Sequence, residues 1–164
     1  MAEENYDIER ELKNWFSEAG KTVVVGIGNP IRTDDFVGVK IVQNLQGKVS
    51  RNVLLLECET VPESFIQQIV DFDPTHVLLI DAAILDLKPG EPRLIEPARL
   101  MDFPAFSTHM LPLRIFCEYL TKTTSSRIGL LLVEPLSVCF GEGLTSPILA
   151  ASERLSQILV DTLP

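Results

Sequence analysis

TVVVGIGNPIRTDDFVG, residues 22–38, joins a short apolar run to a tight turn and the start of a helix. The run at 22–28 is β-branched and closes on glycine, which is typical of a strand buried on both faces. The turn at 28–33 leads into an expected helix over 34–46, in which Val37, Ile41 and Leu45 share one face. This strand-turn-helix unit predicts a parallel sheet.

The rest of the chain continues the alternation. Further strands are expected at residues 53–56, 76–80, 93–95 and 128–133, and further helices at 62–70, 111–121 and 147–163. Such alternation predicts an α/β fold of three α/β/α layers, with a mostly parallel, twisted sheet flanked by helices. Right-handed crossovers place the second strand outside the first and the third on its other side. Ligands of such sheets bind at the carboxyl ends of the strands, near the switch point between the first and third strands.

Residues 1–20 predict an additional N-terminal helix. Ile8, Leu12, Trp15 and Phe16 fall on one helical face, and Asp7 can cap the start. This helix is expected to pack on the outside of the domain, with a partner-docking helix as the alternative. A chain of 164 residues suits one domain over 1–164, with 21–164 forming the α/β part.

The charge balance excludes several classes of partner. The chain has 14 Lys and Arg against 23 Asp and Glu, a net charge of -9. Such acidity is a poor match for nucleic acid or an anionic membrane surface. No apolar run reaches the length of a membrane span, and the acidic start does not resemble a signal peptide. We therefore expect a cytoplasmic protein with no membrane insertion, and a monomer.

The three cysteines, Cys58, Cys117 and Cys139, are odd in number and widely spaced, and they form no C-x-x-C pair. This pattern excludes a disulfide framework and a zinc ribbon. Each is expected to act as a small buried apolar residue.

Acidic residues follow the ends of three expected strands. Asp34 and Asp35 come after the first strand, Glu57 follows the second, and Asp81 ends the third. His109 lies just before a helix near the same edge. The topology therefore lets Asp35, Asp81 and His109 converge. Two carboxylates and one imidazole suit a borderline divalent cation such as nickel or zinc.

Each of these residues also has a purely structural interpretation. Asp34 or Asp35 can serve only as an acid at a helix N-terminus. His109 can be a structural histidine, and His76, which opens a strand, is expected at the surface. Asp81 is harder to explain in this way, because an acid that ends a buried strand is costly unless it is partnered or hydrated.

Several familiar catalytic motifs are absent: H-E-x-x-H, G-x-S-x-G and G-x-x-x-x-G-K-[ST] do not occur. Residues 26–28 begin a dinucleotide fingerprint, and Glu57 could hold a ribose. However, Ile31 replaces the third glycine, and two aspartates stand where a pyrophosphate needs bare amide groups. A flavodoxin-like nucleotide-binding domain stays as an alternative class.

Four motifs together resemble a known family. They are GIGNPIRTDDFVG (26–38), VPES (61–64), LLIDAAILDLKPGEPRLIEP (78–97) and FSTHMLPL (106–113). From about residue 23 to the end, the chain resembles the hydrogenase maturation endopeptidases of nickel-iron hydrogenases. It is more similar to the branch that serves formate-hydrogenlyase-type hydrogenases, because Asp35 stands where the uptake branch tends to carry Glu.

The resemblance implies an endopeptidase that removes the C-terminal extension of a hydrogenase large-subunit precursor after nickel insertion. It implies that Asp35, Asp81 and His109 are both the metal-contacting and the catalytic residues, with nickel carried by the substrate. A non-catalytic factor that recognises nickel is the alternative. Whether the metal activates the peptide or its attacking water, or a carboxylate acts as general base, stays open.

The chain departs from the family pattern at two loops. Glu57-Cys58-Glu59 stands where Asp-Gly-Gly is common, and Glu134 stands where Gln often precedes the proline. The charge of Glu134 is therefore expected to alter the rim of the site. The N-terminal helix has no clear counterpart in the family.

Overall fold

A computed structural model describes residues 6–102 and 110–164 and contains a five-stranded sheet of order β2-β1-β3-β5-β4. The strands are β1 (Thr22–Ile27), β2 (Val53–Glu59), β3 (His76–Ala82), β4 (Pro92–Ile95) and β5 (Arg127–Val133). Neighbouring strands pair in parallel except β4, which runs antiparallel to β5 at one edge. The predicted strand order, with the switch point between β1 and β3, is confirmed.

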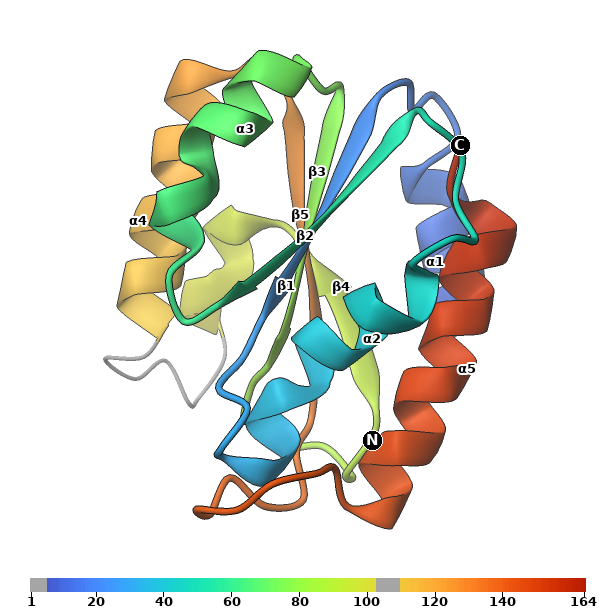
Figure 1. Ribbon diagram of the computed structural model, residues 1–164, viewed down its shortest axis with the longest axis vertical. Coiled ribbons are helices and arrows are strands. Elements are labelled where there is room, and N and C mark those ends of the chain that lie inside the picture. The colour runs from blue at the N-terminus through green and yellow to red at the C-terminus, as the bar shows by residue number, and fades with distance from the viewer. Residues whose placement is uncertain (1–5, 103–109) are drawn as a thin grey trace.

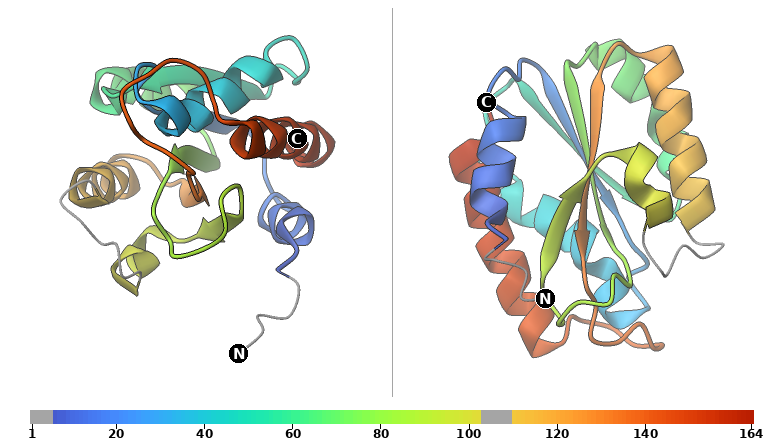
Figure 2. Two further views of the ribbon diagram at one scale, coloured as in Figure 1. Left: turned by 90° about the horizontal axis from the view of Figure 1, so that it is seen from below. Right: turned by 180° about the vertical axis from the view of Figure 1, so that it is seen from behind.

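Helices cover both faces of the sheet and complete the expected three layers (Figure 1; Figure 2). The helices are α1 (Ile8–Trp15), α2 (Val37–Leu45), α3 (Ile66–Phe72), α4 (Met110–Thr123) and α5 (Ser146–Thr162). One face packs against α3 and α4, and the other packs against α1, α2 and α5. In the described part of the chain, no helix is long and apolar enough to cross a membrane.

The central strands are apolar throughout because they contribute to two cores. Val23 and Val25 of β1 enter the core beneath α3 and α4, whereas Val24 enters the core beneath α2 and α5. All three side chains are completely buried. A strand with helices on both faces needs apolar residues at every position, which explains the run that the sequence showed.

Short 3₁₀ helices replace the first turns of two expected helices. Thr33–Phe36 precedes α2, and Pro62–Phe65 precedes α3. A third 3₁₀ helix, Pro97–Asp102, was not predicted. The expected helix start at 34 is wrong because the main chain at 33–34 bonds to a distant loop, and Thr33 has a positive φ of 50°.

The N-terminal helix packs on the outside of the sheet, as expected. Ile8, Leu12 and Trp15 are buried against the domain, and the Asp7 side chain caps the helix by accepting from the Arg10 amide at 3.2 Å. Its apolar face is therefore already covered by the chain itself.

His76 is not at the surface, so that prediction was wrong. Only 7% of the residue is exposed, and its ring meets the Trp15 ring edge-on at 4.9 Å. Burial, and then the positive charge of Arg127, lowers the pKa of His76. The additional helix explains the difference, since its tryptophan covers the start of β3.

Gly38 allows α2 to lie directly on the carboxyl ends of β1 and β3. A Cβ atom at this position would lie 2.0 Å from the Ile80 carbonyl oxygen and 2.5 Å from the Ile27 carbonyl oxygen. Both obstacles are main-chain atoms of central strands, so they cannot move aside without separating α2 from the sheet.

The Gly38→Ala variant should therefore lose about 3 kcal/mol of unfolding free energy. Gly47→Ala is the comparison, because Gly47, unlike Gly38, has a positive φ of 77°, and nothing lies within 4 Å of its added Cβ. That variant should lose only about 1 kcal/mol, from backbone strain. Urea unfolding measures both values, and equal losses would show that close approach is not the reason for glycine at 38.

Candidate active site

A cleft of about 730 Å³ opens at the carboxyl edge of the sheet, at the switch point between β1 and β3. One wall comes from the end of β1 and the turn after it, and another comes from the end of β3. A third, apolar wall comes from α4. Its lining residues are Ile27, Gly28, Asp35, Thr60, Pro62, Glu63, Ile66, Asp81, Ala82, Pro112, Leu113, Ile115, Phe116 and Tyr119. The cleft therefore contains two of the three predicted site residues.

Asp35 is held at the cleft by the turn that follows β1. One carboxylate oxygen, Oδ2, accepts a hydrogen bond from the Asn29 amide at 2.9 Å. The main chain of Asp35 presses against Gly28, where a Cβ atom would lie 2.1 Å from the Asp35 carbonyl oxygen. The second glycine of the G-x-G stretch therefore allows the close approach of the Asp35 main chain in this protein.

Asp81 lies at the end of β3 and remains partly accessible through the cleft. Its Oδ1 atom accepts a hydrogen bond from the Ala82 amide at 2.8 Å. Burial, and then the negative charge of Asp35, raises the pKa of Asp81 well above the usual value for an aspartic acid, and the Ala82 bond only partly opposes this. The two carboxylates are thus close enough to repel each other, so a proton or a cation stabilises the pair.

The raised pKa of Asp81 predicts a pH-dependent difference between the metal-free protein and its Asp81→Asn variant. Protonated Asp81 stabilises the folded wild-type protein. Its contribution to the free energy of unfolding is complete below the pKa of aspartic acid in the unfolded chain, about 3.9, and is lost as the pH rises through the higher pKa of the folded protein. Asparagine cannot ionise, so the variant should gain stability relative to wild type across that window and keep the gain above it. Unfolding midpoints measured with a chelator between about pH 4 and pH 9 test this, and a pH-independent difference would contradict it.

His109 lies outside the described residues. The described part of α4 begins at the next residue, and Pro112, Leu113 and Phe116 of that helix line the cleft. Across residues 6–102 and 110–164, no group of three His, Cys, Asp or Glu side chains could hold a metal ion. The structure brings Asp35 and Asp81 to one cleft, and the convergence of His109 with them stays a prediction.

Asp34 has a structural role that the sequence did not suggest. It is completely buried, and its carboxylate accepts hydrogen bonds from the amides of Leu136 (3.0 Å), Ser137 (3.0 Å) and Thr145 (2.8 Å), and from the Thr145 hydroxyl (2.7 Å). Asp34 therefore fastens the loop after β5 to the turn after β1. Asp34 therefore does more than place a negative charge at a helix N-terminus, which was its expected structural role.

Glu134 does not lie on the rim of the cleft, so the expected effect of its charge there is wrong. Only 4% of the residue is exposed, and its carboxylate accepts from the amides of Leu85 (3.0 Å) and Leu87 (2.7 Å). These bonds fix the loop that follows β3. Glu57 is also outside the cleft, where it accepts a hydrogen bond from the Gln43 side chain at 2.8 Å.

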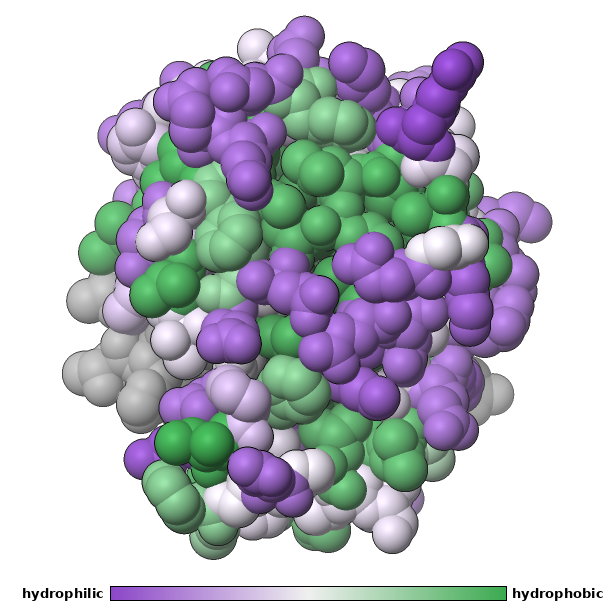
Figure 3. Space-filling view, in the orientation of Figure 1, coloured by the Kyte–Doolittle hydropathy of each residue, from purple (hydrophilic) through white to green (hydrophobic). Residues whose placement is uncertain are grey.

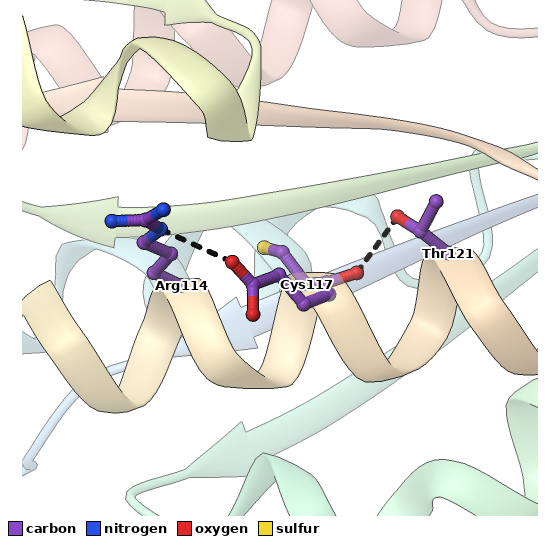
Figure 4. A network of polar contacts seen from close by, with 4 residues as sticks. Arg114, Cys117 and Thr121 are labelled. Carbon is purple, nitrogen blue, oxygen red and sulfur yellow. Dashed lines mark hydrogen bonds and ion pairs between the residues drawn. The ribbon is translucent and has the colours of Figure 1, made fainter.

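Two of the three cysteines are buried, as expected. Burial raises the pKa of both Cys58 and Cys117 to about 12, so neither thiol supplies a thiolate nucleophile near neutral pH. Cys117 sits within α4, where its carbonyl oxygen accepts from the Thr121 hydroxyl at 2.9 Å (Figure 4). Cys139 is exposed, so the prediction of burial is wrong for this residue.

The apolar wall of the cleft was not predicted. Ile115 and Tyr119 project from α4 with 57% and 49% of their surfaces exposed. The one signal in the sequence was that the expected helix over 111–121 carries apolar residues on more than one face, which is more than packing on the sheet requires. This wall gives the cleft an acidic end and an apolar side.

Comparison with known proteins shows which family the chain belongs to. The sequence profile described as "Hydrogenase maturation protease" matches residues 39–162, a range that includes Asp81. A Methanocaldococcus jannaschii protein with a provisional hydrogenase maturation protease name is 34% identical over 128 residues, covering 73% of this chain and 75% of that protein. The hydrogenase 3 maturation protease of Escherichia coli is 29% identical over 137 residues, covering 84% and 87%.

The fold is similar to that of a solved relative. The crystal structure of the [NiFe] hydrogenase maturation protease HycI from Thermococcus kodakarensis matches with a TM-score of 0.87 and 34% identity. The match covers 93% of this chain and 98% of the other. The chain therefore belongs to the hydrogenase maturation protease family, and it is a hydrolase that acts on peptide bonds.

Proposed function

We propose that this protease removes the C-terminal extension of a nickel-iron hydrogenase large-subunit precursor after nickel insertion. Asp35, Asp81 and His109 would engage the nickel that the precursor carries. The observation that supports this most strongly is the pairing of Asp35 and Asp81 in one cleft, where the charge of one raises the pKa of the other.

The pair favours a cation that arrives with the substrate. Two carboxylates that repel each other are stabilised when a divalent ion lies between them, and carboxylate and imidazole ligands suit nickel. Two aspartates and one histidine leave the coordination of the metal incomplete, so the free protein would hold nickel only weakly. Ligands on the precursor would complete it, so that a precursor without nickel would not dock correctly.

The hydrolytic step can use the same residues in two ways. Either the substrate's metal polarises the scissile carbonyl, or one of the aspartates accepts the proton of the attacking water. Either aspartate is placed for the second route, because both carboxylates line the cleft.

Within the family, we propose that the substrate is a hydrogenase of the formate-hydrogenlyase type. The similarity to the E. coli hydrogenase 3 maturation protease and to HycI of T. kodakarensis supports this, together with the presence of aspartate at position 35. We also propose that the protein works in the cytoplasm as a monomer, in line with its net charge of -9.

The test is to incubate the protein with nickel-loaded and nickel-free precursor and to record the intact mass of the precursor. The nickel-loaded precursor should lose its C-terminal extension, and the nickel-free precursor should keep its full mass. Cleavage of both forms at similar rates would contradict the role of nickel, and an unchanged mass in both would contradict the proposed substrate. Nanomolar binding of nickel to the free protein would instead indicate a resident metal.

A further inference from the structure

The large apolar side chains that the described residues expose are concentrated around the cleft. Those on the segments after β1, β2, β3 and β5 and in the first turn of α5 are Ile31, Val61, Ile84, Leu136, Val138, Phe140 and Leu149. The remaining two are Ile115 and Tyr119, on the wall of the cleft itself. Figure 3 shows apolar side chains, interspersed with polar ones, over the loops at the lower end of the molecule, and a broader apolar area between α2 and α3. Apolar side chains gathered at one end of a protein commonly mark a binding surface.

Four of these residues lie on two joined loops and define a docking rim: Ile31, Leu136, Val138 and Phe140. Their exposed fractions range from 37% for Val138 to 81% for Phe140. They come from two loops, one after β1 and the other after β5, that lie far apart in the sequence. Phe140 is the most exposed large apolar residue in the described part of the chain.

Hydrogen bonds hold the two loops of the docking rim together. The Gly141 amide donates to the Ile31 carbonyl at 2.9 Å, and the Thr33 amide donates to the Gly141 carbonyl at 3.0 Å. The Thr33 hydroxyl donates to the Cys139 carbonyl at 2.6 Å, and buried Asp34 accepts from the amides of Leu136 and Ser137 earlier in the same loop. These hydrogen bonds fix the backbone of both loops. The exposed position of the rim side chains is therefore set by the fold.

The docking rim is continuous with the cleft. The turn 28–35 contributes Ile31 to the rim, while Gly28 and Asp35 at its two ends line the cleft. A molecule whose peptide segment reaches Asp35 can therefore also contact the rim. A segment that fills about 730 Å³ would not also cover the rim loops, whereas the folded body from which the segment emerges would.

We propose that the docking rim binds the folded body of the hydrogenase large-subunit precursor, through an apolar patch at the root of its C-terminal extension. This proposal rests on the proposed function, and it adds that selection depends on a folded partner as well as on the extension and its metal. Phe140 is the expected anchor, since exposed aromatic residues dominate the binding energy of many protein interfaces.

The test uses the Phe140→Asp variant and nickel-loaded full-length precursor, with cleavage followed by intact mass. We expect KM to rise about 30-fold, the effect of losing one anchor residue, while kcat at saturating precursor stays unchanged. Phe140→Leu should restore most of the affinity because it keeps an apolar side chain. Asn14→Asp, which adds the same charge on α1 far from the rim, should leave KM unchanged.

The outcomes separate this proposal from the function on which it rests. If the wild-type protein does not cleave nickel-loaded precursor, the proposed function fails. If the wild type cleaves and Phe140→Asp has an unchanged KM, or loses kcat alone, the docking rim is wrong. Thermal unfolding should show an unchanged midpoint for Phe140→Asp, since the side chain is 81% exposed. Leu136→Asp, tested in the same way, provides a second variant on the same rim.

Discussion

Replacing Asp81 by asparagine should reduce the rate of extension removal by about a thousandfold while the protein stays folded. Asparagine keeps the size of the side chain and an oxygen that can accept from the Ala82 amide. It removes the negative charge that would attract the cation and the oxygen that would accept a proton. Measuring kcat/KM with nickel-loaded precursor tests the prediction, and circular dichroism checks the fold.

The matched control is Asp86→Asn, an exposed aspartate in the loop that follows β3. Asp86 has a positive φ of 62°, a conformation that asparagine adopts as readily as aspartate. This control should process the precursor at the wild-type rate. Asp35→Asn should fail as Asp81→Asn does, and full processing by either cleft variant would remove that carboxylate from the chemistry.

Asp34→Ala should lower the free energy of unfolding by at least about 3 kcal/mol. The substitution removes a completely buried carboxylate and leaves the partly buried amides of Leu136, Ser137 and Thr145 without their acceptor. Unpaired buried donors are costly, and these donors lose a charged partner. Urea unfolding measures the loss directly.

The adjacent residue provides the control for this effect. Asp35 is only half-buried and accepts one amide bond, from Asn29, so Asp35→Ala should cost about 1 kcal/mol. The two variants should therefore separate stability from activity: the first unfolds easily, and the second stays stable but does not process precursor. Equal losses of stability would contradict the division of roles between the neighbouring aspartates.

The sheet and the position of the cleft could be predicted because both depend on regular patterns. Alternating strands and helices fix the order of parallel strands, and parallel strands bring their carboxyl ends to one edge. Asp35 and Asp81 each follow a buried strand, so their meeting in one cleft was visible from topology alone. His109 lies outside the described residues, so its place at this edge stays a prediction.

The roles of Asp34 and Glu134 could not be predicted, because their partners lie far away along the chain. Asp34 and Asp35 are equivalent in sequence pattern, and only the folded loop after β5 shows that one is buried and the other faces the cleft. From the sequence, Glu134 is expected at the rim of the cleft. Only the fold shows that its carboxylate accepts hydrogen bonds from amides in the loop after β3. The docking rim was missed for the same reason, since pairing of two remote loops determines which apolar residues stay exposed.

The most direct test of the central claim is the nickel X-ray absorption spectrum of the loaded precursor, recorded alone and after rapid mixing and freezing with the protein before cleavage. The wild-type protein should add oxygen and nitrogen ligands to the nickel, and the Asp35→Asn, Asp81→Asn and His109→Ala variants should each reduce that gain. An unchanged spectrum in a sample where binding of the two proteins is demonstrated would contradict the account.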